Sequence, residues 1–306
     1  MNVEKDFKVL KSCPGDYCGR ILLPAGNYSD CGACPRGYRR LSTYQCELCQ
    51  EQPTFYNWLY LLFMATLPLF YHWYYIDYKV TNRQLSRKLI ISAVLETMTS
   101  SAVTLLLMDP IGTVRLNSCP IKSIHDWYTF LYNPAPNYED YIYCTQEVVY
   151  PLYTMIFVFY IFGILSLLLI RPWFMDGKTD FNSALSTLYA GLYLYPILGV
   201  VHAVCCGFIY YMFPYLIIIV SVISNAVHFA VKLDQSMSFL IKDTITSGRN
   251  LFIVMIHWLC HAFGIIGITQ LNNPVLHYPL LCLVPVPTLF YILTSRLTDP
   301  RKLHAE

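Results

Sequence analysis

Residues 181–231 read FNSALSTLYAGLYLYPILGVVHAVCCGFIYYMFPYLIIIVSVISNAVHFAV and contain no Asp, Glu, Lys or Arg. A helix needs about 20 mostly apolar residues to cross the hydrocarbon layer of a membrane. The run is therefore too long for one crossing and about right for two. Because Pro214 would interrupt a continuous helix, the run predicts two helices, over 184–206 and 209–231, with a turn near Tyr210–Tyr215.

The composition of the whole chain also indicates a membrane protein. Its 306 residues are 56% hydrophobic and 16% aromatic but only 13% charged, and the mean hydropathy is +0.43. An ordinary soluble domain has roughly 25% charged residues, which cover its apolar surface in water. A single globular cytosolic domain is therefore excluded. The net charge of +2 is too small to indicate a nucleic-acid partner, which is bound by neutralising phosphates.

Apolar stretches of membrane-crossing length recur along the chain and predict an all-α membrane protein with seven transmembrane helices. They lie near residues 57–76, 89–108, 148–170, 184–206, 209–231, 251–269 and 278–295. The last stretch contains three prolines, which membrane helices tolerate where neighbours satisfy the freed backbone groups. The predicted organisation is a small head over 1–56, a transmembrane domain over 57–295 and a tail over 296–306.

The distribution of Lys and Arg predicts the orientation of the chain, because positive charges concentrate on the cytosolic side of a membrane. The segments 77–88, 171–183 and 232–250 and the tail hold twelve Lys and Arg, whereas the other connections hold two. The head is therefore predicted to face the lumen or exterior and the tail the cytosol. Residues 1–12 lack the apolar core of a signal peptide, so we expect the first span to carry the head across the membrane.

Eight of the twelve cysteines fall in segments predicted to face the lumen. They are Cys13, Cys18, Cys31, Cys34, Cys46 and Cys49 in the head and Cys119 and Cys144 in the 109–147 loop. Thiols in an oxidising compartment usually form disulfides, and a small head with few large aliphatic side chains needs such cross-links. Two C-x2-C pairs in the head would fit a zinc ribbon in a reducing compartment, and that alternative stays open. The sequence does not choose among the pairings of the six head cysteines.

Two further features belong to the same segments. Asn27-Tyr28-Ser29 is an acceptor for N-glycosylation, which is used only on the lumenal side. Cys119 and Cys144 are predicted to form a bridge with each other, because such a bridge would tie the ends of an otherwise unconstrained loop.

Ionisable side chains inside predicted spans are functional hypotheses by default. They are His72, Glu96, His202, His228, His257 and His261. His257 and His261 share one helix face and, with Glu96, form a candidate metal or proton site. The metalloprotease motif places Glu directly after the first His, where this chain has Trp258. We favour packing roles, with Glu96 facing the bundle interior, either neutral or paired with a histidine. No catalytic residue, cofactor or metal is predicted.

The segments predicted to be cytosolic are short. None of them is long enough to bury a core of catalytic size. The chain is therefore predicted not to be an enzyme, and any cytosolic activity would belong to a recruited partner.

A series of motifs runs in order from the head to the last span. They lie at residues 16–19 (DYCG), 31–37 (CGACPRG), 56–60 (YNWLY), 126–129 (DWYT), 131–134 (LYNP), 150–154 (YPLYT), 257–262 (HWLCHA), 283–285 (LVP) and 289–291 (LFY). Together they resemble the JNK-associated membrane protein family. Departures from the family pattern lie mainly in the first dozen residues and in the 232–250 loop.

The resemblance implies a seven-span protein of the endoplasmic reticulum membrane. It implies a non-catalytic adaptor that binds Jun N-terminal kinase under stress and recruits proteasomes and a membrane ubiquitin ligase for the removal of misfolded proteins.

Two other function classes stay open at this stage. A lumenal disulfide-bonded head on seven spans would also suit a ligand-sensing receptor, although the chain has no Asp-Arg-Tyr at the end of the third span and no Asn-Pro-x-x-Tyr in the seventh. A transporter or membrane enzyme would use Glu96 and the intramembrane histidines.

Overall fold

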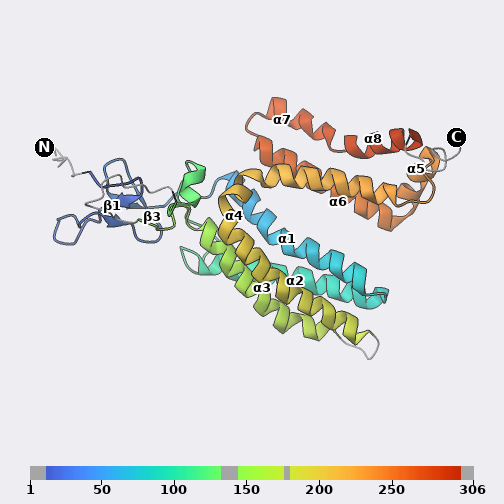
Figure 1. Ribbon diagram of the computed structural model, residues 1–306, viewed down its shortest axis with the longest axis horizontal. Coiled ribbons are helices and arrows are strands. Elements are labelled where there is room, and N and C mark those ends of the chain that lie inside the picture. The colour runs from blue at the N-terminus through green and yellow to red at the C-terminus, as the bar shows by residue number, and fades with distance from the viewer. Residues whose placement is uncertain (1–11, 132–143, 176–179, 298–306) are drawn as a thin grey trace. The chain divides into compact units, whose positions relative to one another are not determined.

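A computed structural model describes residues 12–131, 144–175 and 180–297 (Figure 1). The described chain is mostly helical, with a disulfide-rich region before the first helix. It divides into two units, one ending at Ile209 and the other beginning at Tyr210. The predicted glycosylation acceptor Asn27 lies within the described residues, whereas most of the predicted tail, residues 298–306, lies outside them.

The head is built from two short antiparallel hairpins held by disulfides. β1 (Cys18–Gly19) pairs with β2 (Gly32–Ala33), and β3 (Tyr38–Arg40) pairs with β4 (Cys46–Leu48). Cys13–Cys31 and Cys34–Cys46 close the head on itself. A Cβ at Gly19 would stand 2.9 Å or less from the sulfurs of Cys34 and Cys46, so only glycine lets the backbone pass over that disulfide.

The other two disulfides join the head to the connection between the second and third helices. They are Cys18–Cys144 and Cys49–Cys119. The prediction of a Cys119–Cys144 bridge is therefore wrong. The head folds against the loop and buries all four of these sulfur-bearing residues, so each loop cysteine meets a head cysteine instead of its neighbour in sequence.

Four helical segments form the bundle of the first unit. α1 (Phe55–Lys79) begins at its cap Thr54, and α2 (Arg83–Leu107) begins at its cap Asn82, whose side chain accepts from two backbone N–H groups. α3 (Leu152–Phe174) and the first part of α4 (Phe181–Ala230) complete the bundle, and Figure 1 shows these segments side by side. Apolar side chains of α1, α2 and α4 fill its core: Ile76, Leu85, Leu89, Ala93, Ala184 and Leu188.

The α2–α3 connection contributes one 3-10 turn, η1 (Ile124–Trp127), to the end of this bundle. The Trp127 ring meets Tyr60 of α1 edge to face at 5.8 Å between centroids. A Cβ at Gly207 of α4 would lie 2.8 Å from the Trp127 side chain, so this glycine makes room for the turn. The η1 turn therefore packs against the end of the bundle.

α4 differs from the prediction, because it is one continuous helix of 50 residues. The expected turn near Tyr210–Tyr215 is absent, and the helical pattern runs through Pro214. Gly264 and Gly267 of α6 explain the tolerance, since a Cβ at either would fall within 3.0 Å of Pro214. α6 thus packs closely on the proline. With 50 residues, α4 has enough helix for two crossings at about 20 residues each.

The second unit packs the end of α4 with the remaining helices. These are α5 (Met237–Thr246), α6 (Gly248–Thr269), α7 (Pro274–Leu280), η2 (Leu281–Leu283), α8 (Val286–Thr294) and η3 (Ser295–Leu297). Its core contains Phe229, Leu240, Val254 and Ile292. α5 gives the predicted 232–250 loop a helix that buries Leu240, so this connection is ordered.

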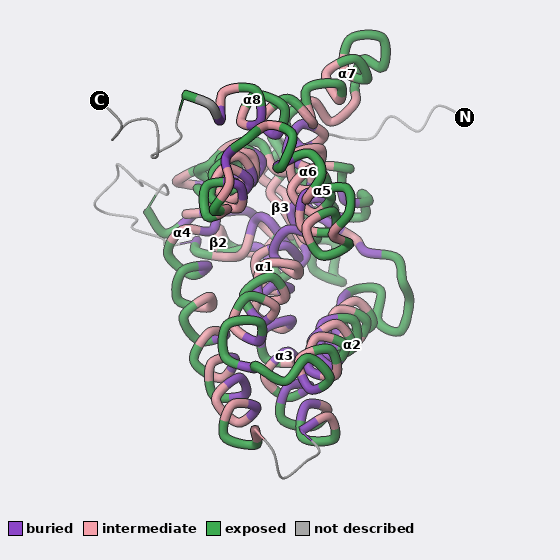
Figure 2. The backbone as a smooth tube through the Cα atoms, turned by 90° about the vertical axis from the view of Figure 1, so that its right-hand side faces the viewer, coloured by how far each residue is buried: buried purple, intermediate pink, exposed green. Residues whose placement is uncertain are grey.

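Among the described residues, five helices are long and apolar enough to cross a membrane: α2, α3, α4, α6 and the α7–α8 segment from Pro274 to Thr294. α1 is long enough, but tyrosine, histidine and asparagine side chains are interspersed along it. The count of seven is therefore not reproduced. Figure 2 shows much of the helical surface exposed, as lipid-facing helices require, and α7 buries none of its residues.

Candidate functional site: two buried arginine–carboxylate pairs

An arginine of α3 meets a glutamate of α2 inside the first bundle. Arg171 Nη2 lies 2.7 Å from Glu96 Oε2, and Arg171 Nε donates to Glu96 Oε1 at 3.0 Å. The two side chains are 0% and 1% exposed. Ser92, one turn before Glu96, donates its hydroxyl to the same carboxylate at 2.6 Å. Charges this deeply buried persist only when geometry and further hydrogen bonds compensate their desolvation, and the fork-shaped pairing supplies both.

The same guanidinium connects all four helical segments of the bundle. Its Nη1 donates to the Thr187 carbonyl of α4 at 3.2 Å and lies 3.4 Å from His72 Nδ1 of α1. Glycines provide the space for the aromatic neighbours: a Cβ at Gly191 would stand 2.6 Å from the His72 ring, and one at Gly163 2.6 Å from the Tyr195 ring. Arg171 is thus a single residue on which four helices converge.

Three polar atoms beside this pair are buried without a hydrogen-bond partner among the described residues. They are His72 Nε2, Tyr160 Oη and Tyr195 Oη. Their rings form a row, with His72 and Tyr195 centroids 6.0 Å apart and Tyr160 and Tyr195 centroids 5.9 Å apart. The bundle therefore has a polar interior that extends beyond the ion pair itself.

The sequence predicted part of this centre. Glu96 does face the bundle interior, but of the two alternatives predicted for it, pairing with a histidine is wrong, because its carboxylate is held by Arg171. Arg171 was assigned to a cytosolic connection, whereas α3 continues through it to Phe174. The available signal was the apolar Trp173-Phe174 that follows Arg171 and prolongs the hydrophobic stretch.

A second arginine–carboxylate pair joins the head to η1. Asp126, 4% exposed, accepts from Arg39 Nη2 at 2.9 Å and from the Tyr17 hydroxyl at 3.3 Å. It also accepts from the backbone N–H groups of Lys122 at 2.7 Å and Ser123 at 3.3 Å. Burial of Tyr17, and secondarily the negative charge of Asp126, raise the pKa of the Tyr17 phenol.

A third set of contacts continues this junction toward α3. Gln146 donates to the Tyr17 carbonyl at 2.6 Å, and the Tyr150 hydroxyl donates to Asp109. Burial, helped by that carboxylate, raises the pKa of Tyr150 to about 12. Arg36 of the head lies over the Tyr150 ring at 5.1 Å. The head and the described parts of the α2–α3 connection therefore form one module, which we call the head–loop module (residues 12–54, 108–131 and 144–151).

The remaining candidates are dispersed. His257 Nδ1 lies 3.1 Å from the Ser224 hydroxyl, and the His228 ring is 6.5 Å from the His257 ring. His261 is half-buried on α6, the helix that also carries His257. Within the described ranges no group of three His, Cys, Asp or Glu is placed to hold a metal ion. Asn27 is exposed in a turn of the head, and the four cysteines outside the disulfides lie on α4, α6 and η2.

Comparison with known proteins gives a consistent result. A family model described as JNK1/MAPK8-associated membrane protein matches residues 13–300. The chain is 39% identical to the human and to the mouse JNK1/MAPK8-associated membrane protein, with 96% of each chain covered. It is 32% identical to the Caenorhabditis elegans homolog, with 94% covered. No solved structure matches.

Proposed function

We infer the function of this chain from the JNK1/MAPK8-associated membrane protein family, to which it belongs over nearly its full length. We propose that it is a non-catalytic adaptor in the endoplasmic reticulum membrane that binds a Jun N-terminal kinase. The relatives are named for association with that kinase, and this is the observation that carries the proposal. Recruitment of proteasomes and of a membrane ubiquitin ligase, for degradation of misfolded proteins, is the finer part of the same proposal.

The disulfides support a lumenal position for the head–loop module. Eight cysteines are paired, and disulfides persist in oxidising compartments such as the reticulum lumen. The glycosylation acceptor Asn27 is exposed in this module, as attachment of a glycan requires. The kinase, a cytosolic partner, would then bind the opposite face of the membrane.

The same disulfides support an additional span that hydropathy alone leaves out. Cys18 and Cys49 precede α1, whereas Cys144 and Cys119 follow α2. Disulfides between them require both segments to lie on the same side of the membrane, so α1 and α2 together cross an even number of times. Since α2 is a candidate span, α1 must cross as well. With α4 crossing twice, the proposed total is seven.

The cytosolic face in this arrangement offers little material. It comprises the α1–α2 turn, the α3–α4 connection, the segment that contains α5, and the tail. α5 is fixed by Leu240 and by the Lys232–Asp243 ion pair at 2.7 Å, so it presents a defined surface. Such short elements suit a docking platform, with the catalytic work done by the bound proteins.

Affinity purification from stressed cells tests the proposal. The full chain, a form lacking residues 298–306 and a form with Ile241 and Ile245 of α5 changed to serine would be compared. Ile241→Ser and Ile245→Ser remove exposed apolar side chains and leave the buried Leu240 in place. Jun N-terminal kinase should be enriched with the full chain and reduced by at least one of the changes. Absence of the kinase, proteasome subunits and ligase from all three purifications would refute the adaptor function.

A further inference from the structure

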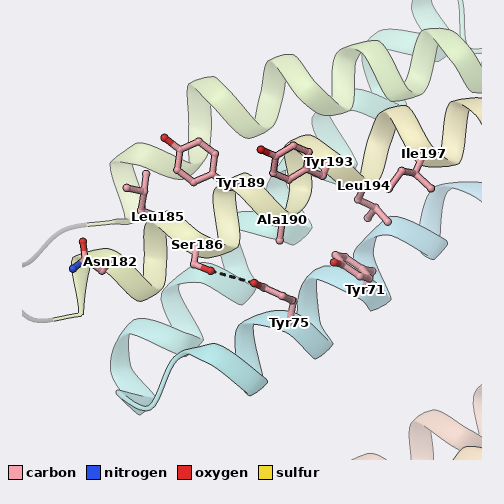
Figure 3. A pocket seen from close by; sticks show the side chains of 10 residues that line it. All are labelled: Tyr71, Tyr75, Asn182, Leu185, Ser186, Tyr189, Ala190, Tyr193, Leu194 and Ile197. Atoms are coloured by element: carbon pink, nitrogen blue, oxygen red, sulfur yellow. Dashed lines mark hydrogen bonds between the residues drawn. The ribbon is translucent and has the colours of Figure 1, made fainter.

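A groove runs along the outer surface of the first bundle, between α1 and the beginning of α4. It has a volume of about 710 Å³ and is lined by Tyr71 and Tyr75 of α1 and by α4 side chains between Asn182 and Ile197. We call it the α1–α4 groove (Figure 3). Ligand sites for small molecules typically measure about 300–1,000 Å³, so this groove has the size of a binding site.

One end of the groove is polar. Asn182 lies in the first turn of α4, and one turn later the Ser186 hydroxyl lies 3.1 Å from the Tyr75 hydroxyl. Figure 3 shows this hydrogen bond linking the two walls. Tyr75 is itself one turn before the end of α1 at Lys79. The polar end therefore lies at the membrane face where α1 ends and α4 begins.

The other end of the groove is mostly apolar, with the Tyr193 ring among its lining side chains. Ala190, Leu194 and Ile197 line it, and the small side chain of Ala190 leaves the middle open. From Asn182 to Ile197 the helix rises about 22 Å. Half of a bilayer, with its headgroup region, is about 20–22 Å thick. The length of the groove therefore matches the thickness of one leaflet.

Two stacked tyrosine rings at the polar end match the same environment. Tyr71 stacks on Tyr75 with ring centroids 6.0 Å apart. Tyrosines of membrane proteins gather at the level of the headgroups, where the ring is apolar and the hydroxyl meets polar groups. A second cavity, of about 190 Å³ between α1, α2 and α3, is lined almost wholly by apolar side chains and lacks this polar-to-apolar gradient.

We propose that the α1–α4 groove binds one membrane phospholipid. Its glycerol and headgroup lie at Asn182, Ser186 and Tyr75, and an acyl chain follows Ala190 and Leu194 to Ile197. A transmembrane helix of another protein is an alternative occupant with an apolar surface. It lacks a concentrated polar group to lie beside Ser186 and Tyr75. The bound lipid joins α1 to α4.

Photolabelling of the full chain in nanodiscs tests this site. The probe is a phosphatidylcholine with a diazirine near the end of one acyl chain, and cross-linked peptides are mapped by mass spectrometry. The apolar end of the groove, residues 190–197, should carry the label about tenfold above exposed residues of α4 outside the groove, such as Val204. Ala190→Trp fills the middle of the groove and should remove that excess. Val204→Trp, on the same helix, should leave it unchanged.

Two milder variants distinguish loss of lipid binding from misfolding of the chain. Ala190→Leu adds less volume and should lower labelling by an intermediate amount, while Tyr75→Phe keeps the ring and removes only the hydroxyl at the polar end. Equal labelling of the groove and of Val204 in the wild-type chain would overturn the proposal, because the groove would then be in contact with bulk lipid only. Displacement of the label by a sterol but not by unlabelled phosphatidylcholine, or cross-linking of the groove to another polypeptide, would overturn it as well.

Discussion

The head–loop module and the helical bundle of the first unit each contain a buried arginine–carboxylate pair, but the surroundings of the two pairs differ. Asp126 and Arg39 sit among four disulfides, two of which join the same segments that the ion pair joins. Among the described residues no disulfide links the helices around Glu96 and Arg171, and the Arg171 side chain contacts α1, α2 and α4. Arg39 remains 13% exposed, whereas Arg171 is fully buried.

The difference shows how each environment compensates a lack of hydrophobic driving force. The head is too small to bury much apolar surface, so disulfides restrict its unfolded state and the ion pair only aligns the parts. In lipid, helix association gains little from apolar burial, so buried polar contacts and small residues carry the specificity. The pair in the bundle should therefore matter more than the pair in the head.

The largest effect is expected for Arg171→Met in the bundle. Removing one partner leaves the Glu96 carboxylate buried without its counter-charge, which costs about 3–5 kcal/mol. Unfolding by titration with sodium dodecyl sulfate measures the change. The double variant Glu96→Gln, Arg171→Met should be more stable than Arg171→Met alone, because no charge is then stranded. If the double variant loses as much stability as the two single variants together, the two residues do not act as a pair.

A smaller loss is expected when one covalent link of the module is removed. Cys18→Ser with Cys144→Ser should cost about 2–4 kcal/mol, and the head should become sensitive to protease. A disulfide that closes a longer loop is expected to stabilise a protein more. Cys18 and Cys144 are 126 residues apart, but the expected loss stays at that level because α1 and α2 already restrict the intervening chain. Cys205→Ser and Cys282→Ser are the matched controls, since both thiols are free. A head equally resistant in all variants would contradict the role given to the disulfide.

Asp126→Asn should cost less again, about 1.5–3 kcal/mol, the range for hydrogen bonds to a charged group. The Lys122 and Ser123 amides donate to this carboxylate, so their hydrogen exchange should accelerate. Asp30→Asn, at an exposed position of the head, is the control. Unchanged exchange at both amides would show that Asp126 does not organise the turn.

The smallest effect is expected for Tyr17→Phe, about 0.5–1.5 kcal/mol at neutral pH. Burial and Asp126 raise the pKa of Tyr17 in the folded state, so the unfolded chain loses this proton first as the pH rises. Head stability from this residue is therefore complete below about pH 10 and declines above it. Denaturation at a series of alkaline pH values should show a shallower decline for Tyr17→Phe. Identical slopes would assign the decline to other groups.

The sequence predicts which residues belong to each region better than it predicts which of them pair with each other. The oxidising compartment identified the disulfide cysteines, but Cys18–Cys144 depends on how the head folds onto a distant loop. Glu96 was placed in the interior because lipid excludes an exposed carboxylate. Its partner Arg171 was missed because a charge at the edge of an apolar stretch resembles a loop residue. By its sequence alone Pro214 predicts a helix break, because the close packing of Gly264 and Gly267 on it is a tertiary feature.

The position of the head–loop module is tested most directly by protease digestion of sealed reticulum vesicles. Tags are placed before Cys13 and after Glu306. A lumenal, disulfide-bonded module predicts that the first tag survives until detergent opens the vesicles, while the second is removed at once. Loss of the first tag from sealed vesicles would place the eight cysteines on the reducing side, and would contradict both the lumenal module and the seven-span adaptor.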